Sequence, residues 1–216
     1  MARIAEDLYL LLLDNAAAQP ALGPERRRRV LAGALLLDLA HACRIRPSGP
    51  GDPVQSGRLV ALSGNDPLDH TLLPAFDLLS RKALRPRVAV SKLSKGAQDH
   101  LSTRLEGLGE IRRVQVSGNQ SAWPFRSRQR VGPARAALLS ALFDGTPPTP
   151  STAAIVTLLH AADGLGALLS LNDRGWRWVH TRASEISSGS WVDESPTSLA
   201  EVNLAVTASV VRSALL

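Results

Sequence analysis

The chain has 216 residues, of which 44% are hydrophobic and 20% are charged. This balance is typical of a globular domain and excludes a disordered or fibrous chain. The single cysteine, Cys43, cannot form an internal disulfide, and the five scattered histidines form no zinc-binding cluster with it. We therefore expect one domain over residues 1–216, an intracellular protein, and no bound metal or other cofactor.

The first part of the chain is predicted to contain two helices, of which the second is buried. Residues 4–13 are apolar enough for a helix, and the acidic Glu6 and Asp7 near its start argue against a signal peptide. Pro24 suits the start of a second helix, which continues to residue 41 and is apolar on most sides. We expect this helix to be buried, with Arg26–Arg29 in its first turn left outside. No stretch approaches the ~20 apolar residues that cross a bilayer.

The middle of the chain mixes short strands with helices. A strand over 58–62 is expected to pair with residues near Arg44. A helix is predicted to begin with Asp66 as its N-cap, and another to cover 95–108 before a glycine. The alternating residues 111–116 predict one strand of a β-hairpin.

The rest of the chain is expected to be helical. Trp123 and Phe125 are expected to lie exposed near the end of the hairpin. Further helices are predicted over 133–143, over 151–169 with Ser151 as cap, over 174–187 and over 197–215. Leu and Ala are the commonest residues and aromatics make up only 4%, which also favours helices. The predicted fold is mainly α, with seven or eight helices in a single compact domain and a few short strands that include a protruding β-hairpin.

Positive charge is concentrated in the centre of the chain. Residues 78–143 contain 13 Lys and Arg residues but only three acidic ones, against a net charge of +6 for the whole chain. Only three of the 25 basic residues are Lys, so the charge is almost entirely guanidinium, which binds phosphate well by geometry. Such a segment suits an anion-binding face, or else is a solvated face with no partner.

No sequence motif indicates an enzyme. The chain has no Gly-x-Ser-x-Gly elbow, no phosphate-binding glycine loop and no His-Glu-x-x-His pair. Asp69 next to His70, and His160 close to Asp163, are more often structural than catalytic. Trp176 and Trp178 are expected to be core or partner-contact residues rather than an aromatic cage. We therefore predict no catalytic residues.

Five segments occur in an order that resembles the bacterial branch of the Golgi phosphoprotein 3 family. They are 5–14 (AEDLYLLLLD), 32–40 (AGALLLDLA), 65–73 (NDPLDHTLL), 100–111 (HLSTRLEGLGEI) and 153–163 (AAIVTLLHAAD). The resemblance implies a mostly helical domain that binds membranes peripherally by recognising phosphatidylinositol 4-phosphate. It also implies a β-hairpin that touches the bilayer and supports self-association.

The resemblance assigns few lipid-binding residues in this chain. Of the basic positions that hold the lipid headgroup in the family, only Lys95 keeps its charge. A family Trp aligns near Gly23 and a family Arg aligns with Ala32. Arg28 and Arg29 lie four and three residues before Ala32, so helix geometry lets either reach the same face and replace the missing guanidinium. The hairpin matches in place, with Arg112 and Arg113 at its root.

The sequence thus predicts a cytoplasmic protein that binds anionic phospholipid reversibly at the inner face of a membrane. The predicted lipid-binding residues are Arg28, Arg29, Lys95, Arg112 and Arg113, supported by Arg26–Arg29 as a whole and by 126–130, with Trp123 and Phe125 as shallow membrane anchors. A homo-oligomer formed through the hairpin is also expected. Two alternatives remain open, which are nucleic-acid binding by the Arg-rich segment and a cytosolic oligomeric scaffold without lipid binding.

Overall fold

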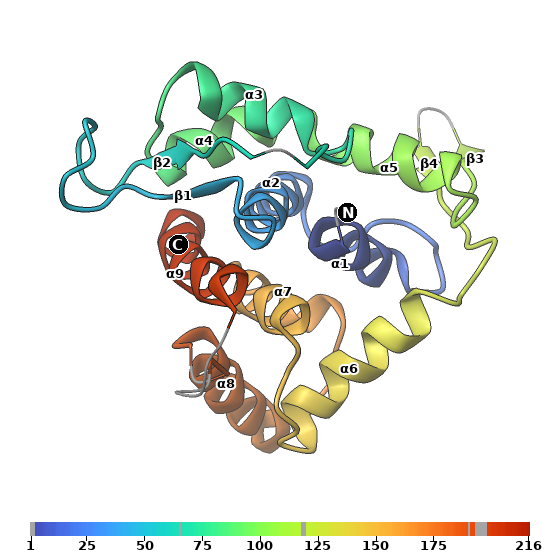
Figure 1. Ribbon diagram of the computed structural model, residues 1–216. Coiled ribbons are helices and arrows are strands. Elements are labelled where there is room, and N and C mark those ends of the chain that lie inside the picture. The colour runs from blue at the N-terminus through green and yellow to red at the C-terminus, as the bar shows by residue number, and fades with distance from the viewer. Residues whose placement is uncertain (1–2, 65, 118–119, 190, 193–197) are drawn as a thin grey trace.

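The computed structural model describes residues 3–64, 66–117, 120–189, 191–192 and 198–216. Over these residues the chain forms nine α-helices, one short 3-10 helix and two small two-stranded antiparallel sheets (Figure 1). The buried apolar residues form a contiguous core cluster to which most of the helices contribute. The predicted mainly α fold with a few short strands is therefore confirmed.

The helix α2 (Pro24–His41) lies at the centre of this core. Every residue from Val30 to Ala40 is buried, and the helix packs against α1, α4, α5, α7 and α9. In Figure 1 it lies between α3 and α4 on one side and α7 and α9 on the other. A Cβ atom at Gly33 would lie 3.0 Å from Leu158 Cδ2 and 3.2 Å from Val211 Cγ1, so glycine permits the close approach of α7 and α9. The predicted buried helix is confirmed.

The helix α1 (Arg3–Leu13) is fixed to α2 through a buried carboxyl group. Asp38, in the middle of α2, accepts hydrogen bonds of 2.9 Å from the backbone N–H groups of Ile4 and Ala5. N–H groups in the first turn of a helix have no acceptor within their own helix. Asp38 is only 3% exposed, and burial raises its pKa to about 8 against the opposing effect of the two N–H donors. This side chain therefore caps α1 from a neighbouring helix.

The two sheets lie at different places in the fold. Strand β1 (Ile45–Pro47) pairs with β2 (Leu59–Ala61), which confirms the predicted strand and its pairing partner. Strand β3 (Val114–Ser117) pairs with β4 (Gln120–Ala122) in the predicted hairpin, whose turn at 118–119 lies outside the described residues. Ile111 is not part of β3 but forms an isolated bridge with Phe125. The predicted strand over 111–116 therefore begins three residues later than expected.

Three helices lie between β2 and β3 in the described chain. The helix α3 (Leu73–Arg81) does not begin at Asp66 as predicted, because Asp69 forms a turn with Thr71 and an ion pair with Arg104. Pro74 stands in its first turn instead. The helix α4 (Pro86–Leu93) was not predicted. The helix α5 (Ala97–Gly107) lies within the predicted 95–108 range and ends before Gly109, whose φ of 73° favours glycine.

Of the last four helices, α7 and α9 pack against α2, and α6 and α8 pack against α7. The helix α6 (Val131–Phe143) was predicted within two residues. The helix α7 (Pro150–Ala161) is capped by Thr149, not by Ser151, and stops before Asp163, whose φ is 48°. A short 3-10 helix (Leu165–Ala167) follows, so a continuous helix to residue 169 was wrong. The helices α8 (Asp173–Ser187) and α9 (Leu199–Leu215) confirm the last two predictions to within two residues.

Candidate functional site

A pocket lined mainly by basic side chains lies between the start of α2 and the α4 helix. Its volume is about 500 Å³. We call it the basic pocket, and its lining residues are Glu25, Arg28, Arg29, Arg87, Ser91, Ser94 and Lys95. Three of the five predicted lipid-binding residues, Arg28, Arg29 and Lys95, are therefore brought together from segments that are far apart in the sequence.

Two helices position these side chains. Pro24 occupies the first turn of α2 and places Glu25 and the arginines at its exposed end. Pro86 does the same for α4, on which Arg87 and Ser91 lie four residues apart and so share one face. Sequence reasoning missed Arg87 because α4 itself was not predicted. The Arg-Pro pair at 85–86 was the signal for this helix start.

The cations of the basic pocket are not equivalent. Arg28, Arg87 and Lys95 are exposed, and within the described part of the chain none of them forms an ion pair or a side-chain hydrogen bond. Arg29 is half-buried and donates to the carbonyl oxygens of Ala214, at 2.7 Å, and Leu215, at 3.4 Å. Its guanidinium thus caps the end of α9. Three cations of the pocket remain available to an anion.

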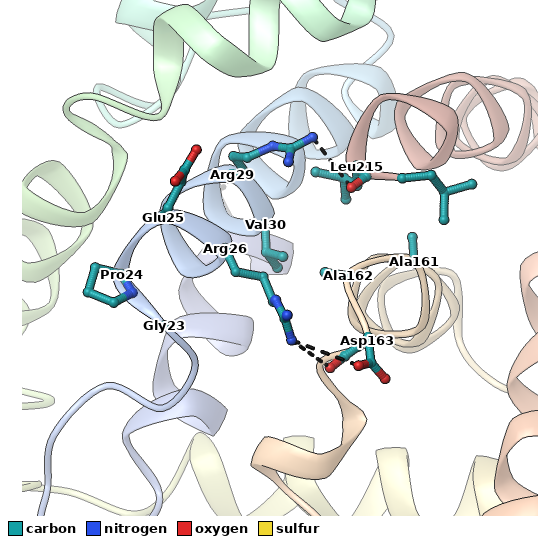
Figure 2. A pocket seen from close by; sticks show the side chains of 11 residues that line it. Gly23, Pro24, Glu25, Arg26, Arg29, Val30, Ala161, Ala162, Asp163 and Leu215 are labelled. Carbon is teal, nitrogen blue, oxygen red and sulfur yellow. Dashed lines mark hydrogen bonds and ion pairs between the residues drawn. The ribbon is translucent and has the colours of Figure 1, made fainter.

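The other two arginines of the run at the start of α2 have partners. A neighbouring depression has a volume of about 760 Å³. In Figure 2 Arg26 points there toward Asp163, which follows the end of α7. Arg26 donates to the Asp163 carbonyl oxygen at 3.2 Å, and its guanidinium lies 3.9 Å from the carboxylate. Arg27 donates to Gln98 and to the carbonyl oxygen of Leu22, and burial lowers its pKa. The run therefore does not act as one basic surface.

Part of the central basic segment is neutralised by acidic residues of α1 and of the turn that follows it. Arg128 contacts Asp14 at 2.5 Å, and Arg130 contacts both Glu6 and Asp7 at 2.6 Å. Burial raises the pKa of Asp7, although the charge of Arg130 and its hydrogen bond act in the opposite direction. Arg128 and Arg130 are therefore paired with acidic side chains, and a contribution of 126–130 to a membrane-binding face stays a prediction.

The hairpin root lies apart from the basic pocket. Lys95 lies two residues before α5, whereas Arg112 and Arg113 follow this helix, and a helix of this length spans about 16 Å. Arg112 and Arg113 are exposed, and Arg113 donates to the Ser121 hydroxyl at 3.0 Å. In Figure 1 α5 lies between α4 and the hairpin. The structure therefore does not bring Arg112 and Arg113 into the basic pocket.

Trp123 and Phe125 are not exposed as expected. Both are half-buried and pack against the core. The backbone N–H of Trp123 donates to the Ala18 carbonyl oxygen at 2.7 Å, which holds the end of the hairpin against the loop after α1. The exposed apolar side chains of the hairpin are instead Val114 and Val116, at 37% and 58%. A membrane-anchor role for Trp123 and Phe125 stays a prediction.

The arrangement defines a helical protein with a β-hairpin and a separate pocket lined by four basic side chains, of which Arg29 caps the end of α9. A family model described as Golgi phosphoprotein 3 (GPP34) matches residues 4–201, and the chain belongs to this family. A comparison with curated proteins finds no match. None of the helices among the described residues is both long and apolar enough to cross a membrane. The same residues contain no group of three His, Cys, Asp or Glu side chains placed to hold a metal ion.

Proposed function

We propose that this protein is a peripheral membrane protein that binds the phosphate of an anionic phospholipid headgroup in the basic pocket. The observation that carries the proposal is the convergence of Arg28, Arg87 and Lys95, which have no anionic partner within the described residues. Guanidinium and ammonium groups donate charge-assisted hydrogen bonds to phosphate oxygens. Membership of the Golgi phosphoprotein 3 family supports this proposal, and phosphatidylinositol 4-phosphate is the headgroup that the resemblance implies.

The hairpin supplies a second membrane contact in this proposal. Arg112 and Arg113 are exposed beside the apolar Val114 and Val116, a combination that suits the boundary between anionic headgroups and acyl chains. A homo-oligomer formed through the hairpin, and a cytoplasmic location with reversible binding to the inner face of the membrane, belong to the same proposal. Neither property is needed for the basic pocket to bind a headgroup.

Liposome flotation tests the proposal directly. The vesicles are neutral, or contain phosphatidylglycerol, or contain phosphatidylinositol 4-phosphate at equal total charge, each at low and at physiological salt. Each basic residue near an anionic surface contributes about 1 kcal/mol, so replacing both Arg28 and Arg87 by Ala is expected to weaken binding about 30-fold. Binding by the unchanged protein should also decrease with salt.

A double variant with the same loss of charge is the control. Arg174 and Arg177 are exposed on α8, and Figure 1 shows α8 at the opposite end of the molecule from α4. Their joint replacement by Ala should change binding no more than about threefold, because charges beyond the ~10 Å screening length contribute little. Equal loss in both double variants would show that binding follows net charge and not the basic pocket. No binding to either anionic vesicle would refute the proposed function.

A further inference from the structure

One lining residue of the basic pocket is acidic. Glu25 is exposed, and no cation of the described chain lies within 4.0 Å of its carboxylate, although Arg28, Arg87 and Lys95 line the same pocket. Glu25 also lines the neighbouring depression, but in Figure 2 its carboxylate points away from Arg26 and Asp163. Glu25 is therefore an unpaired hydrogen-bond acceptor at the edge of a set of cationic donors.

A carboxylate in this position constrains the headgroup. It repels an anionic group that comes near, and it accepts hydrogen bonds from hydroxyl groups. It could also accept from an ammonium group, but the surrounding cations repel an ammonium ion. Ser91 and Ser94 add two hydroxyl groups, of which the Ser94 hydroxyl donates to the Ser91 carbonyl oxygen at 2.9 Å and keeps its own lone pairs available. The chemistry that fits all of these groups is a phosphate that carries neutral hydroxyl donors.

We propose that Glu25 is a specificity-determining residue that selects polyol phospholipids, by accepting hydrogen bonds from headgroup hydroxyls while the three cations bind the phosphate. This inference rests on the proposed function, because it assumes that the basic pocket binds a lipid headgroup. Its place in the first turn of α2 also lets Glu25 stabilise the helix dipole. The test therefore needs a readout that a structural role alone does not change, and the ratio of affinities for two lipids provides it.

The decisive comparison uses two lipids of equal charge. Phosphatidylglycerol and phosphatidylethanol are both phosphodiesters with one negative charge, but only phosphatidylglycerol has free hydroxyl groups. The unchanged protein is expected to bind vesicles containing phosphatidylglycerol about two- to tenfold more tightly, the effect of one net hydrogen bond. Glu25→Ala should bring this ratio close to one. Because it removes a negative charge, Glu25→Ala should also strengthen binding to both vesicles.

Asp173→Ala is the matched control, because Asp173 is an exposed acidic residue in the first turn of α8 and lies outside the basic pocket. It should leave the ratio unchanged. Equal binding of both lipids by the unchanged protein, or an undiminished preference in Glu25→Ala, would overturn the role of Glu25. Binding to neither anionic lipid would instead refute the proposed function. Calorimetry with soluble glycerophosphoglycerol tests whether the ligand is a lipid or a free phosphodiester. If the protein binds this soluble compound as tightly as it binds phosphatidylglycerol vesicles, the assignment to a lipid is overturned.

Discussion

Replacement of Asp38 tests how the first two helices are joined. In the native structure the two oxygens of its carboxyl group accept hydrogen bonds from the N–H groups of Ile4 and Ala5, both at 2.9 Å. Asp38→Ala leaves both donors buried without an acceptor, and each such group costs about 1–3 kcal/mol. Asp38→Asn keeps one acceptor but turns an NH₂ group toward the other N–H. We expect the free energy of unfolding to fall by about 4 kcal/mol in Asp38→Ala and by about 2 kcal/mol in Asp38→Asn.

The assay is urea unfolding followed by far-UV circular dichroism, together with native-state hydrogen exchange. The midpoint should decrease at an unchanged m-value, and the amides of Ile4 and Ala5 should exchange faster in both variants. Asp77→Asn, at an exposed position of α3, is the control and should change the free energy of unfolding by less than about 0.5 kcal/mol. A loss below about 1 kcal/mol in Asp38→Ala would refute the capping role.

Two further predictions concern charged and titratable groups. Arg130→Ala should lower the free energy of unfolding by about 2–3 kcal/mol, because Glu6 is 5% exposed and loses one of its two cationic partners. Arg130→Lys keeps a positive charge and should lose less stability than Arg130→Ala in the same urea assay. An equal loss in both variants would contradict the prediction. Burial lowers the pKa of His160, and the neighbouring His180 and Arg212 act in the same direction. The unfolded state then binds the proton more tightly, so stability should fall as the pH drops through about 6.5. Urea unfolding at about pH 7.5 and 5.5 measures this loss of stability. The loss between the two pH values should be smaller in His160→Gln than in the unchanged protein, and an equal loss would contradict the prediction.

The fold was predictable where a helix carries its own signals. The buried α2 has Pro24 at its start and apolar residues on all sides, and α8 and α9 have polar caps before apolar patterns. Prediction failed where a tertiary contact decided a boundary. The stretch before α3 is held as a turn because Asp69 contacts Arg104, which lies 35 residues further along the chain. No local pattern reports such a contact.

The basic pocket was predictable only in part. Arg28 and Arg29 were predicted from the geometry of one helix, and Lys95 was predicted from the family resemblance. Arg87 belongs to a helix of eight residues that is too short to give a clear apolar period. Arg29 was expected to bind lipid, yet in the structure it caps the end of α9, because this end packs beside the first turns of α2. Which arginines remain unpaired depends on the packing of helices from opposite ends of the chain.

The pairing of charges also limits how strongly the basic pocket can bind a membrane. The central segment has a large excess of basic residues, but Arg128 and Arg130 neutralise acidic residues of α1 and its following turn. Three available cations at about 1 kcal/mol each correspond to a dissociation constant in the millimolar range. If the protein binds membranes as proposed, the pocket alone would therefore give only brief contacts. Stable attachment would then require a second contact through the hairpin, or several pockets held together in an oligomer so that their affinities combine.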